Sequence, residues 1–146
     1  MTDKTIDERL AEIDAREQAA ERNKRDREKA RRVEREDLRE KYSAELGEEG
    51  KAFAIVDLEP LGADMFVVLR KIAGAVYRRL QAAIATAEKQ KKNADPAIDD
   101  FIQQHVVHPE TEKVIALVDD KPGTGNELLV AAANLYGAGL EGRQKK

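Results

Sequence analysis

Apolar and polar positions divide this chain into two parts of different character. Residues 1–46 contain neither Gly nor Pro and are dominated by charged side chains. Nothing in this stretch interrupts a helix, so it predicts one long, charged N-terminal helix with Thr2 or Asp3 as its cap. The remaining residues carry most of the apolar positions. We therefore expect a globular domain over residues 47–140 and a short tail over residues 141–146.

One short apolar seam lies on the charged N-terminal helix. Ile6, Leu10 and Ile13 recur at the spacing that places them on one face. The same helical phase then meets Glu17, Ala20, Lys24, Arg27 and Arg31. The seam is therefore a fragment of a coiled-coil pattern, and the rest of the helix is polar all round.

The next segment has the pattern of a β-hairpin followed by a helix. Residues 52–58 and 65–70 are rich in Phe, Val and Ile, and Pro60 and Gly62 lie between them. Two such runs joined by Pro and Gly predict paired strands. From Gly74 to Lys92 the apolar residues change to helical spacing, which predicts a helix that packs on the hairpin.

The last third of the chain predicts three short helices separated by turns. Asp95-Pro96 begins the first, with Asp95 as N-cap, and His108-Pro109 ends it. The second runs over residues 110–119. Thr124 and Glu127 have the spacing of a capping box for the third, which Gly137 ends. The whole pattern predicts an α+β fold that is mostly α-helical: a long charged helix, a β-hairpin and a compact bundle of about four helices.

Composition and charge narrow the classes of protein. Of 146 residues, 55 are charged and the net charge is −3, so the chain as a whole is not a general binder of polyanions. The absence of Cys excludes disulfides and thiolate chemistry. No apolar run reaches the roughly 18 residues of a membrane span. We expect a soluble, cytoplasmic protein that binds no membrane, located in the host cytoplasm if the protein is viral.

The residues that could carry chemistry are few. His105 and His108 are three apart with Glu110 nearby, which is a possible zinc-binding set, but Pro109 interrupts the helix that such a pair needs. Packing is the favoured role of His105, and a helix end that of His108.

Other candidate motifs also have structural explanations. Gly123-Thr124-Gly125 lacks the Lys-Ser/Thr ending of a phosphate-binding loop, and helix capping accounts for it. The acid pairs at residues 99–100 and 119–120 are adjacent on helices and so point to different faces. Ser43 is the one serine and lies far from either His. We therefore expect no enzyme, no catalytic or metal-binding residue and no cofactor.

Nucleic-acid binding is an alternative carried by the stretch Arg22 to Arg35. This stretch holds eight Lys or Arg against three acids, which suits phosphate contacts. No aromatic residue precedes Tyr42, so this stretch has no side chain that could stack on nucleic-acid bases. A solvated helix that serves as a spacer or interaction arm is the favoured interpretation.

The last hundred residues present a particular order of signals. Phe66-Val67-Val68-Leu69-Arg70 leads into Tyr77-Arg78-Arg79, and Val106-Val107-His108-Pro109-Glu110, Lys121-Pro122-Gly123 and Leu135-Tyr136-Gly137 follow. Over residues 50–140 this order resembles the tail assembly chaperones of long-tailed bacteriophages. The charged helix of residues 1–46 departs from the compact pattern of that family.

The resemblance implies a non-enzymatic chaperone that binds a helical tape-measure protein, or another tail protein, and keeps it soluble during tail assembly. Members of the family are often made in a short and a longer, frameshifted form, and Gln144-Lys145-Lys146 is compatible with a Lys-coding slippery site. The alternative is a structural or scaffolding phage assembly protein whose charged helix docks onto other subunits.

Partner binding would use apolar side chains that the core does not need. Homo-oligomerisation through the charged helix or through the same apolar face is a further expectation. The candidate partner-binding residues are Ile6, Leu10, Ile13, Val114, Leu117, Val118, Leu128 and Leu135.

Overall fold

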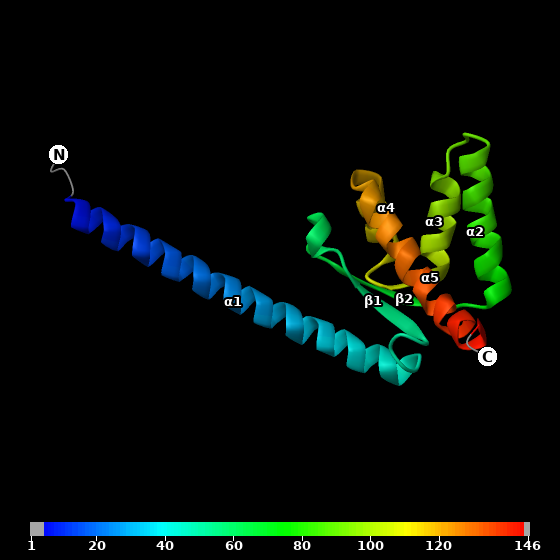
Figure 1. Ribbon diagram of the computed structural model, residues 1–146, viewed down its shortest axis with the longest axis horizontal. Helices are drawn as coiled ribbons and strands as arrows, with labels where there is room; N and C mark the ends of the chain where they lie inside the picture. Colours follow the sequence, from blue (N-terminus) through cyan, green and yellow to red (C-terminus); the bar gives the residue numbers. More distant parts are fainter. Residues whose placement is uncertain (1–4, 145–146) are drawn as a thin grey trace. The chain divides into compact units, whose positions relative to one another are not determined.

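The computed structural model describes the backbone of residues 5–144 and the side chains of residues 5–137. The first element is α1, Ile6–Glu45, which confirms the long charged helix (Figure 1). The Thr5 hydroxyl accepts a hydrogen bond from the backbone N–H of Glu8 at 3.2 Å and so caps the first turn. The caps expected at Thr2 or Asp3 lie outside the described residues. The helix ends just before Gly47, whose φ of 124° favours glycine.

The chain divides into two compact units, and the division lies inside α1. Residues 1–37 form the first unit and residues 38–146 the second. We call residues 5–37 the arm and residues 38–144 the core domain. The sequence places the boundary at residue 46 because the charged pattern continues to that point. Leu38 and Tyr42, one turn apart on α1, are nevertheless buried in a hydrophobic cluster of the core domain.

A small antiparallel sheet forms the centre of the core domain. Its strands are β1 (Phe53–Asp57), β2 (Phe66–Arg70) and β3 (Val106–His108), in the order β1-β2-β3. The β1–β2 pair confirms the expected hairpin, with Phe53 opposite Arg70 and Asp57 opposite Phe66. A 3-10 turn, η1 (Glu59–Leu61), connects the two strands.

The third strand corrects the sequence analysis. The apolar run through Val106 was expected to continue a helix to His108, but the helix ends at His105. Val106 and Val107 are β-branched and suit an extended backbone, and β2 offers them a free edge. Leu69 lies opposite Val106 in this pairing.

Four helices complete the core domain: α2 (Gly74–Lys89), α3 (Asp95–His105), α4 (Thr111–Asp120) and α5 (Pro122–Gln144). The start of α3 is one residue earlier than expected, with Ala94 and not Asp95 at the N-cap. The Asp95 N–H donates a hydrogen bond of 3.0 Å to the side-chain oxygen of Asn93.

The bounds of α5 also differ from the expectation. The helix begins at Pro122, whose fixed φ suits a first helical turn, and it passes through Gly137 to Gln144. The expected capping box is therefore wrong. The Thr124 hydroxyl is buried and donates to the Lys121 carbonyl at 2.6 Å.

Side chains alternate between the two faces of the central strand β2, and both faces are covered by other elements. Val67 and Leu69 belong to the larger hydrophobic cluster, which the helices α2 to α5 help to build. Phe66 and Val68 face the other way and pack with Leu38 and Tyr42 of α1. The end of α1 is thus part of the core.

Candidate functional site

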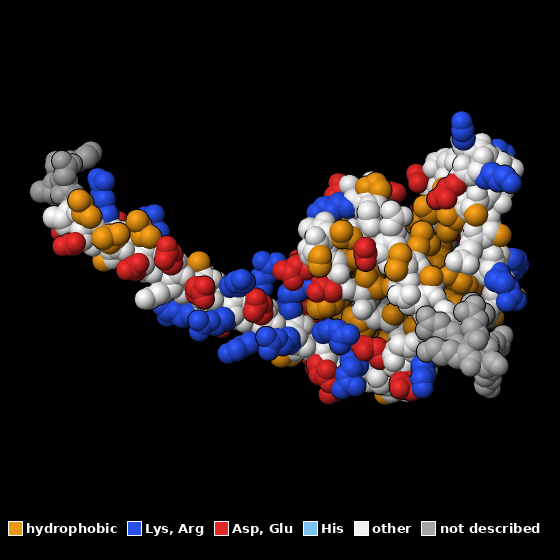
Figure 2. Space-filling view, viewed as in Figure 1, with side chains coloured by type: hydrophobic (Ala, Val, Ile, Leu, Met, Phe, Trp, Pro, Cys, Tyr) orange, Lys and Arg blue, Asp and Glu red, His pale blue; other side chains and the backbone are white. Residues whose placement is uncertain are grey.

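The apolar seam of the arm is exposed. Ile6, Leu10 and Ile13 have exposed fractions of 77%, 53% and 48%. Figure 2 shows apolar side chains gathered near the start of the arm, among acidic and basic ones. These side chains are available to a partner, and their role in binding stays a prediction.

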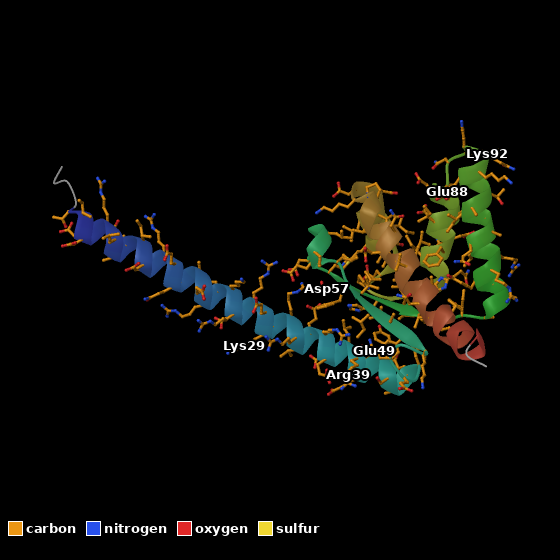
Figure 3. The ribbon with its side chains drawn as sticks, in the orientation of Figure 1. Lys29, Arg39, Glu49, Asp57, Glu88 and Lys92 are labelled. Atoms are coloured by element: carbon orange, nitrogen blue, oxygen red, sulfur yellow. The ribbon has the colours of Figure 1, made fainter. Side chains whose placement is uncertain are left out.

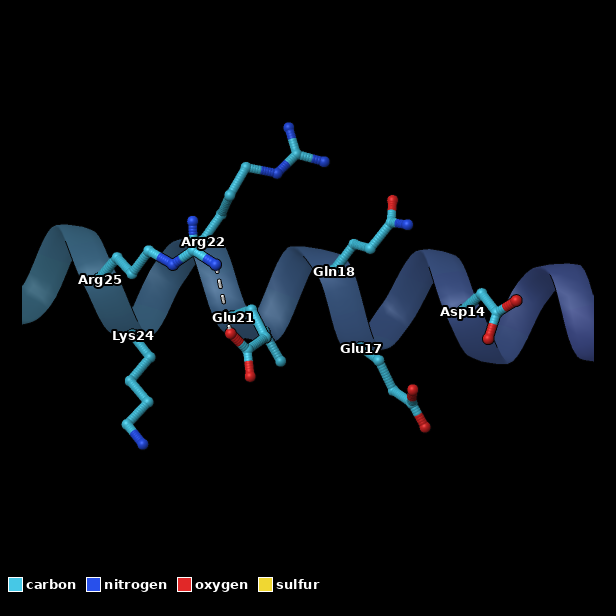
Figure 4. A pocket seen from close by; sticks show the side chains of 8 residues that line it. Asp14, Glu17, Gln18, Glu21, Arg22, Lys24 and Arg25 are labelled. Carbon is cyan, nitrogen blue, oxygen red and sulfur yellow. Dashed lines mark ion pairs between the residues drawn. The ribbon is translucent and has the colours of Figure 1, made fainter.

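The rest of the arm presents charged side chains to solvent. Lys29, for example, points away from the helix (Figure 3). Side chains between Asp14 and Arg25 leave a hollow along the helix, beside which the Arg25 guanidinium lies 3.5 Å from the Glu21 carboxylate (Figure 4). All walls of this hollow come from one helix. It is a shallow space between the exposed side chains of one helix, and we do not assign it as a ligand site.

The apolar candidates of α4 and α5 belong mainly to the core. Val114, Val118, Leu128 and Leu135 are buried, and Leu117 is half-buried against the same cluster. Their side chains therefore stabilise the fold in this conformation. Their role in partner binding stays a prediction, and Val118 also lines the pocket described next.

A small pocket lies where α3, the end of α4 and the start of α5 meet. Its volume is about 140 Å³. Ile98 and Leu129, both half-buried, and the buried Val118 give it an apolar floor, and three carboxylates line it. Figure 2 shows apolar side chains exposed on the face over α3 and beside α5. We call this site the acidic pocket; the residues that define it are Asp95, Ile98, Asp99, Val118, Asp119 and Leu129.

The carboxylates of the acidic pocket repel one another. Partial burial raises the pKa of the Asp99 carboxyl above its ordinary value, and the negative charges of Asp119, Asp95 and Asp100 raise it further. A positively charged group in the pocket would relieve this repulsion. The pocket therefore suits a ligand that combines an apolar part with a cation.

This pocket is not evident from the sequence. Residues 99–100 and 119–120 form adjacent acid pairs there, whereas the structure brings Asp99 of α3 close to Asp119 of α4. Asp95 and Asp99 are four apart and so share a helix face, which was a visible signal. The approach of α4 to that face was not visible in the sequence.

His105 and His108 do not converge as a metal-binding pair would. His105 is fully buried, with Nδ1 3.0 Å from the Phe101 carbonyl and Nε2 3.2 Å from the Tyr136 hydroxyl. His108 lies on β3, with its ring centroid 6.4 Å from that of Tyr42. The packing role favoured for His105 agrees with these contacts.

The buried polar cluster around His105 joins three helices to the β2–α2 connection. Tyr77 and Tyr136 stack with ring centroids 3.7 Å apart, and the Tyr136 hydroxyl accepts a hydrogen bond from the Ile72 N–H at 2.8 Å. Gln81 donates to the Tyr77 hydroxyl at 2.6 Å. Burial raises the pKa of Tyr136, so its hydroxyl stays protonated and serves as a donor.

Comparison with known proteins gives no match to this chain among protein-family models, curated proteins or solved structures. Within residues 5–144, none of the helices combines the length and the apolar character that crossing a membrane requires.

Proposed function

We propose that this chain is a non-enzymatic assembly chaperone of the phage-tail type, which binds a helical, tape-measure-like protein and keeps it soluble. The observation that supports this proposal most directly is the acidic pocket, with an apolar floor and a carboxylate rim on an exposed face of the core domain. The resemblance over residues 50–140 supports the same class of function.

The acidic pocket suits one face of an amphipathic helix. Ile98, Val118 and Leu129 would contact an apolar side chain of the partner, and a cavity of roughly 150 Å³ is known to hold a benzene ring. Asp99 and Asp119 would pair with a Lys or Arg about one turn away on the partner. Such pairing selects helices that are both apolar and basic, which are prone to aggregate when unpartnered.

A structural or scaffolding protein is the second candidate function. It is favoured by the exposed seam of Ile6, Leu10 and Ile13, which gives the arm a docking face of its own. In this case the arm would contact other subunits directly, and the acidic pocket would be dispensable. Nucleic-acid binding through residues 22–35 is a third candidate and would show a steep dependence on salt.

Co-expression with the longest helical protein encoded beside this gene tests the chaperone proposal. The informative variant is Asp99→Lys with Asp119→Lys, which reverses the charge of the rim. The control is Asp100→Lys with Asp120→Lys, which changes net charge equally at exposed neighbouring positions on the same two helices. Circular dichroism checks that both variants fold.

The unaltered chain and the control pair should keep the neighbouring protein soluble, whereas the rim pair should leave it in the pellet. If the unaltered chain does not increase its solubility, the chaperone proposal is wrong for that partner and the structural role gains support. Equal solubility with both variant pairs would show that the acidic pocket is not the binding site.

A further inference from the structure

The imidazole of His105 is enclosed by aromatic rings. Its exposed fraction is 0%, and the Phe101 ring of the same helix is stacked on it, with ring centroids 4.2 Å apart. The rings of Tyr77 on α2 and Tyr136 on α5 approach it edge to face, with centroids 5.9 Å and 6.1 Å away. Water therefore does not reach this ring in the folded chain.

The charges around this ring are all positive. Arg70 of β2 acts on the imidazole electrostatically, and the Lys71 ammonium lies 5.6 Å from the centre of the Tyr136 ring. The ionisable groups from α2 and α5 are the Tyr77 and Tyr136 hydroxyls, which stay neutral because burial raises the pKa of each above its ordinary value of 10.0. Among the described side chains, no carboxylate acts on His105.

From this arrangement we propose that His105 is an acid-sensitive switch, whose protonation releases α2 from α3 and α5 while the rest of the core domain stays folded. Hydrogen bonding alone would tolerate the proton. The Tyr136 oxygen could accept from Nε2–H and give its own hydrogen to the Ile72 carbonyl, 3.2 Å away. The buried charge is what opposes protonation, because neither water nor a carboxylate compensates it. Protonation therefore favours a conformation in which the ring reaches water.

Helix α2 is the element that can open at the least cost. Its 16 residues bury two side chains, those of Tyr77 and Ile84. Tyr77 is itself one wall of the enclosure and stacks on Tyr136 at 3.7 Å. The connection before α2 is held by the same cluster, through the Ile72 N–H and the Tyr136 hydroxyl. Segments with few buried contacts open most readily, and movement of α2 would admit water to His105.

The remaining core has a second centre of stability. Tyr42 belongs to the other hydrophobic cluster, with Leu38, Phe53, Phe66 and Val68, and its hydroxyl donates to the Val107 carbonyl at 3.1 Å. Tyr77 and Tyr136 belong to the cluster that opens, so the three tyrosines of the chain report separately on the two parts.

The sign of the pH dependence follows from the two states. Burial lowers the pKa of His105 in the closed state, whereas contact with water would return it to its ordinary value of 6.5. The open state therefore binds the proton more readily, and opening is favoured as the pH falls below 6.5. Where only the open state is protonated, the opening equilibrium constant rises about tenfold per pH unit, and about thirtyfold by pH 5.

Fluorine NMR of the full chain labelled with 3-fluorotyrosine tests the proposal, since each tyrosine gives its own signal. Between pH 7.5 and pH 5, the signals of Tyr77 and Tyr136 should move together toward their unfolded positions. The Tyr42 signal should keep its folded position. His105→Gln should abolish the joint movement. His108→Gln, which changes the one other histidine of the chain, is the matched control and should preserve it.

A second variant tests the switch even if His105→Gln does not fold. Arg70→Gln removes a positive charge that acts on the ring, so the closed state accepts the proton more easily and the midpoint of opening should shift to lower pH. Arg22→Gln, at an exposed position of the arm, changes the net charge equally and should leave the midpoint unchanged.

Four results would overturn the proposal. Movement of all three tyrosine signals together would mean global unfolding and no local switch. Signals of Tyr77 and Tyr136 that stay in place down to pH 5 would show that the cluster does not open. The same joint movement in His105→Gln would assign it to another group, and an unshifted midpoint in Arg70→Gln would contradict the electrostatic cause.

Discussion

At the residue scale, His105 requires a definite hydrogen-bond arrangement because its ring is fully buried. The Phe101 carbonyl beside Nδ1 only accepts, so Nδ1 carries the proton in the neutral ring. Nε2 is then an acceptor 3.2 Å from the Tyr136 hydroxyl, whose one hydrogen is shared between Nε2 and the Ile72 carbonyl, also 3.2 Å away, while the Ile72 N–H donates to the hydroxyl oxygen. One hydroxyl therefore serves both His105 and the backbone before α2.

The pKa of His105 predicts a loss of stability at acid pH. Burial lowers this pKa below the ordinary value of 6.5, and the positive charge of Arg70 lowers it further, although the hydrogen bond to the Phe101 carbonyl opposes the shift. Below pH 6.5 the unfolded chain binds a proton that the folded chain does not, so the free energy of unfolding falls. The slope from this group approaches at most about 1.4 kcal/mol per pH unit.

Urea unfolding at pH 5 and pH 8 measures this effect. His105→Gln removes the titrating group, so the variant should lose less stability between pH 8 and pH 5 than the unaltered chain. The positive charge that lowers the pKa of His105 is that of Arg70 on β2. The other ionisable groups around the cluster are Tyr77, Tyr136 and Lys71, which lies near the Tyr136 ring. An unchanged pH dependence in the variant would contradict the prediction.

Removal of the hydroxyl group should destabilise the fold more at Tyr136 than at Tyr77, although the two rings stack on each other. Tyr136→Phe leaves the Ile72 N–H and His105 Nε2 without their partner, so we expect it to lower the free energy of unfolding by about 1–3 kcal/mol. Tyr77→Phe removes only the bond from the exposed Gln81 and should cost less. Thermal or urea unfolding of the two variants gives the comparison, and equal losses would argue against the network described here.

The repulsion in the acidic pocket is also testable without a partner. Since the pKa of Asp99 is raised, its charged form is disfavoured in the folded chain, and Asp99→Asn should increase the free energy of unfolding at pH 7. We expect a gain of a few tenths of a kcal/mol because Asp99 is only partly buried. The gain should disappear near pH 3, where the carboxyl is protonated in both states. Asp120→Asn, at an exposed position of α4, is the control.

At the scale of elements, the end of α1 belongs to the core. Leu38 and Tyr42 pack against Phe53, Phe66 and Val68, and the Tyr42 hydroxyl donates to the Val107 carbonyl at 3.1 Å. Leu38→Ala or Tyr42→Ala should therefore lower the free energy of unfolding by about 2–5 kcal/mol.

The matched control for these core substitutions is Leu10→Ala, which changes an exposed leucine of the same helix and should have little effect. A chain that begins at residue 47 lacks both core residues and should be much less stable than one that begins at residue 38. Thermal unfolding of the truncated chains and point variants decides this. Equal stability of the two truncated chains would place the core boundary at residue 46 after all.

The sequence predicted elements where local pattern decides structure. Helix α1 and the β1–β2 hairpin were visible because an uninterrupted charged stretch and two β-rich runs around Pro60 have few alternatives. Strand β3 was not visible, because Val106 and Val107 fit an apolar helix pattern as well as a strand, and their partner β2 is distant in sequence. The acidic pocket was missed for the same reason, since it needs the packing of α4 on α3.

Glycine was the other source of error. The sequence predicts a helix end at Gly137, yet α5 continues through it. Leu128, Ala132 and Leu135 are all buried on one face of α5, and this packing outweighs the modest helix propensity of glycine. Local sequence signals therefore predict which elements form more accurately than they predict where each element ends.

At the scale of the whole molecule, the two units offer separate means of binding. The core domain carries the acidic pocket, and the arm carries the exposed seam. If both surfaces contact the same partner, the effective affinity should exceed that of either surface alone, because the second contact becomes intramolecular.

The continuity of α1 from the core into the arm also has a kinetic consequence. Starting a helix in water is the unfavourable step, whereas lengthening one that exists is nearly free. Once Leu38 and Tyr42 are packed on the sheet, their turn of α1 is already wound and acts as a seed from which the arm grows toward its N-terminus. The arm should therefore wind only after the core has formed, and a peptide of residues 1–37 alone should be less helical than the same residues in the full chain.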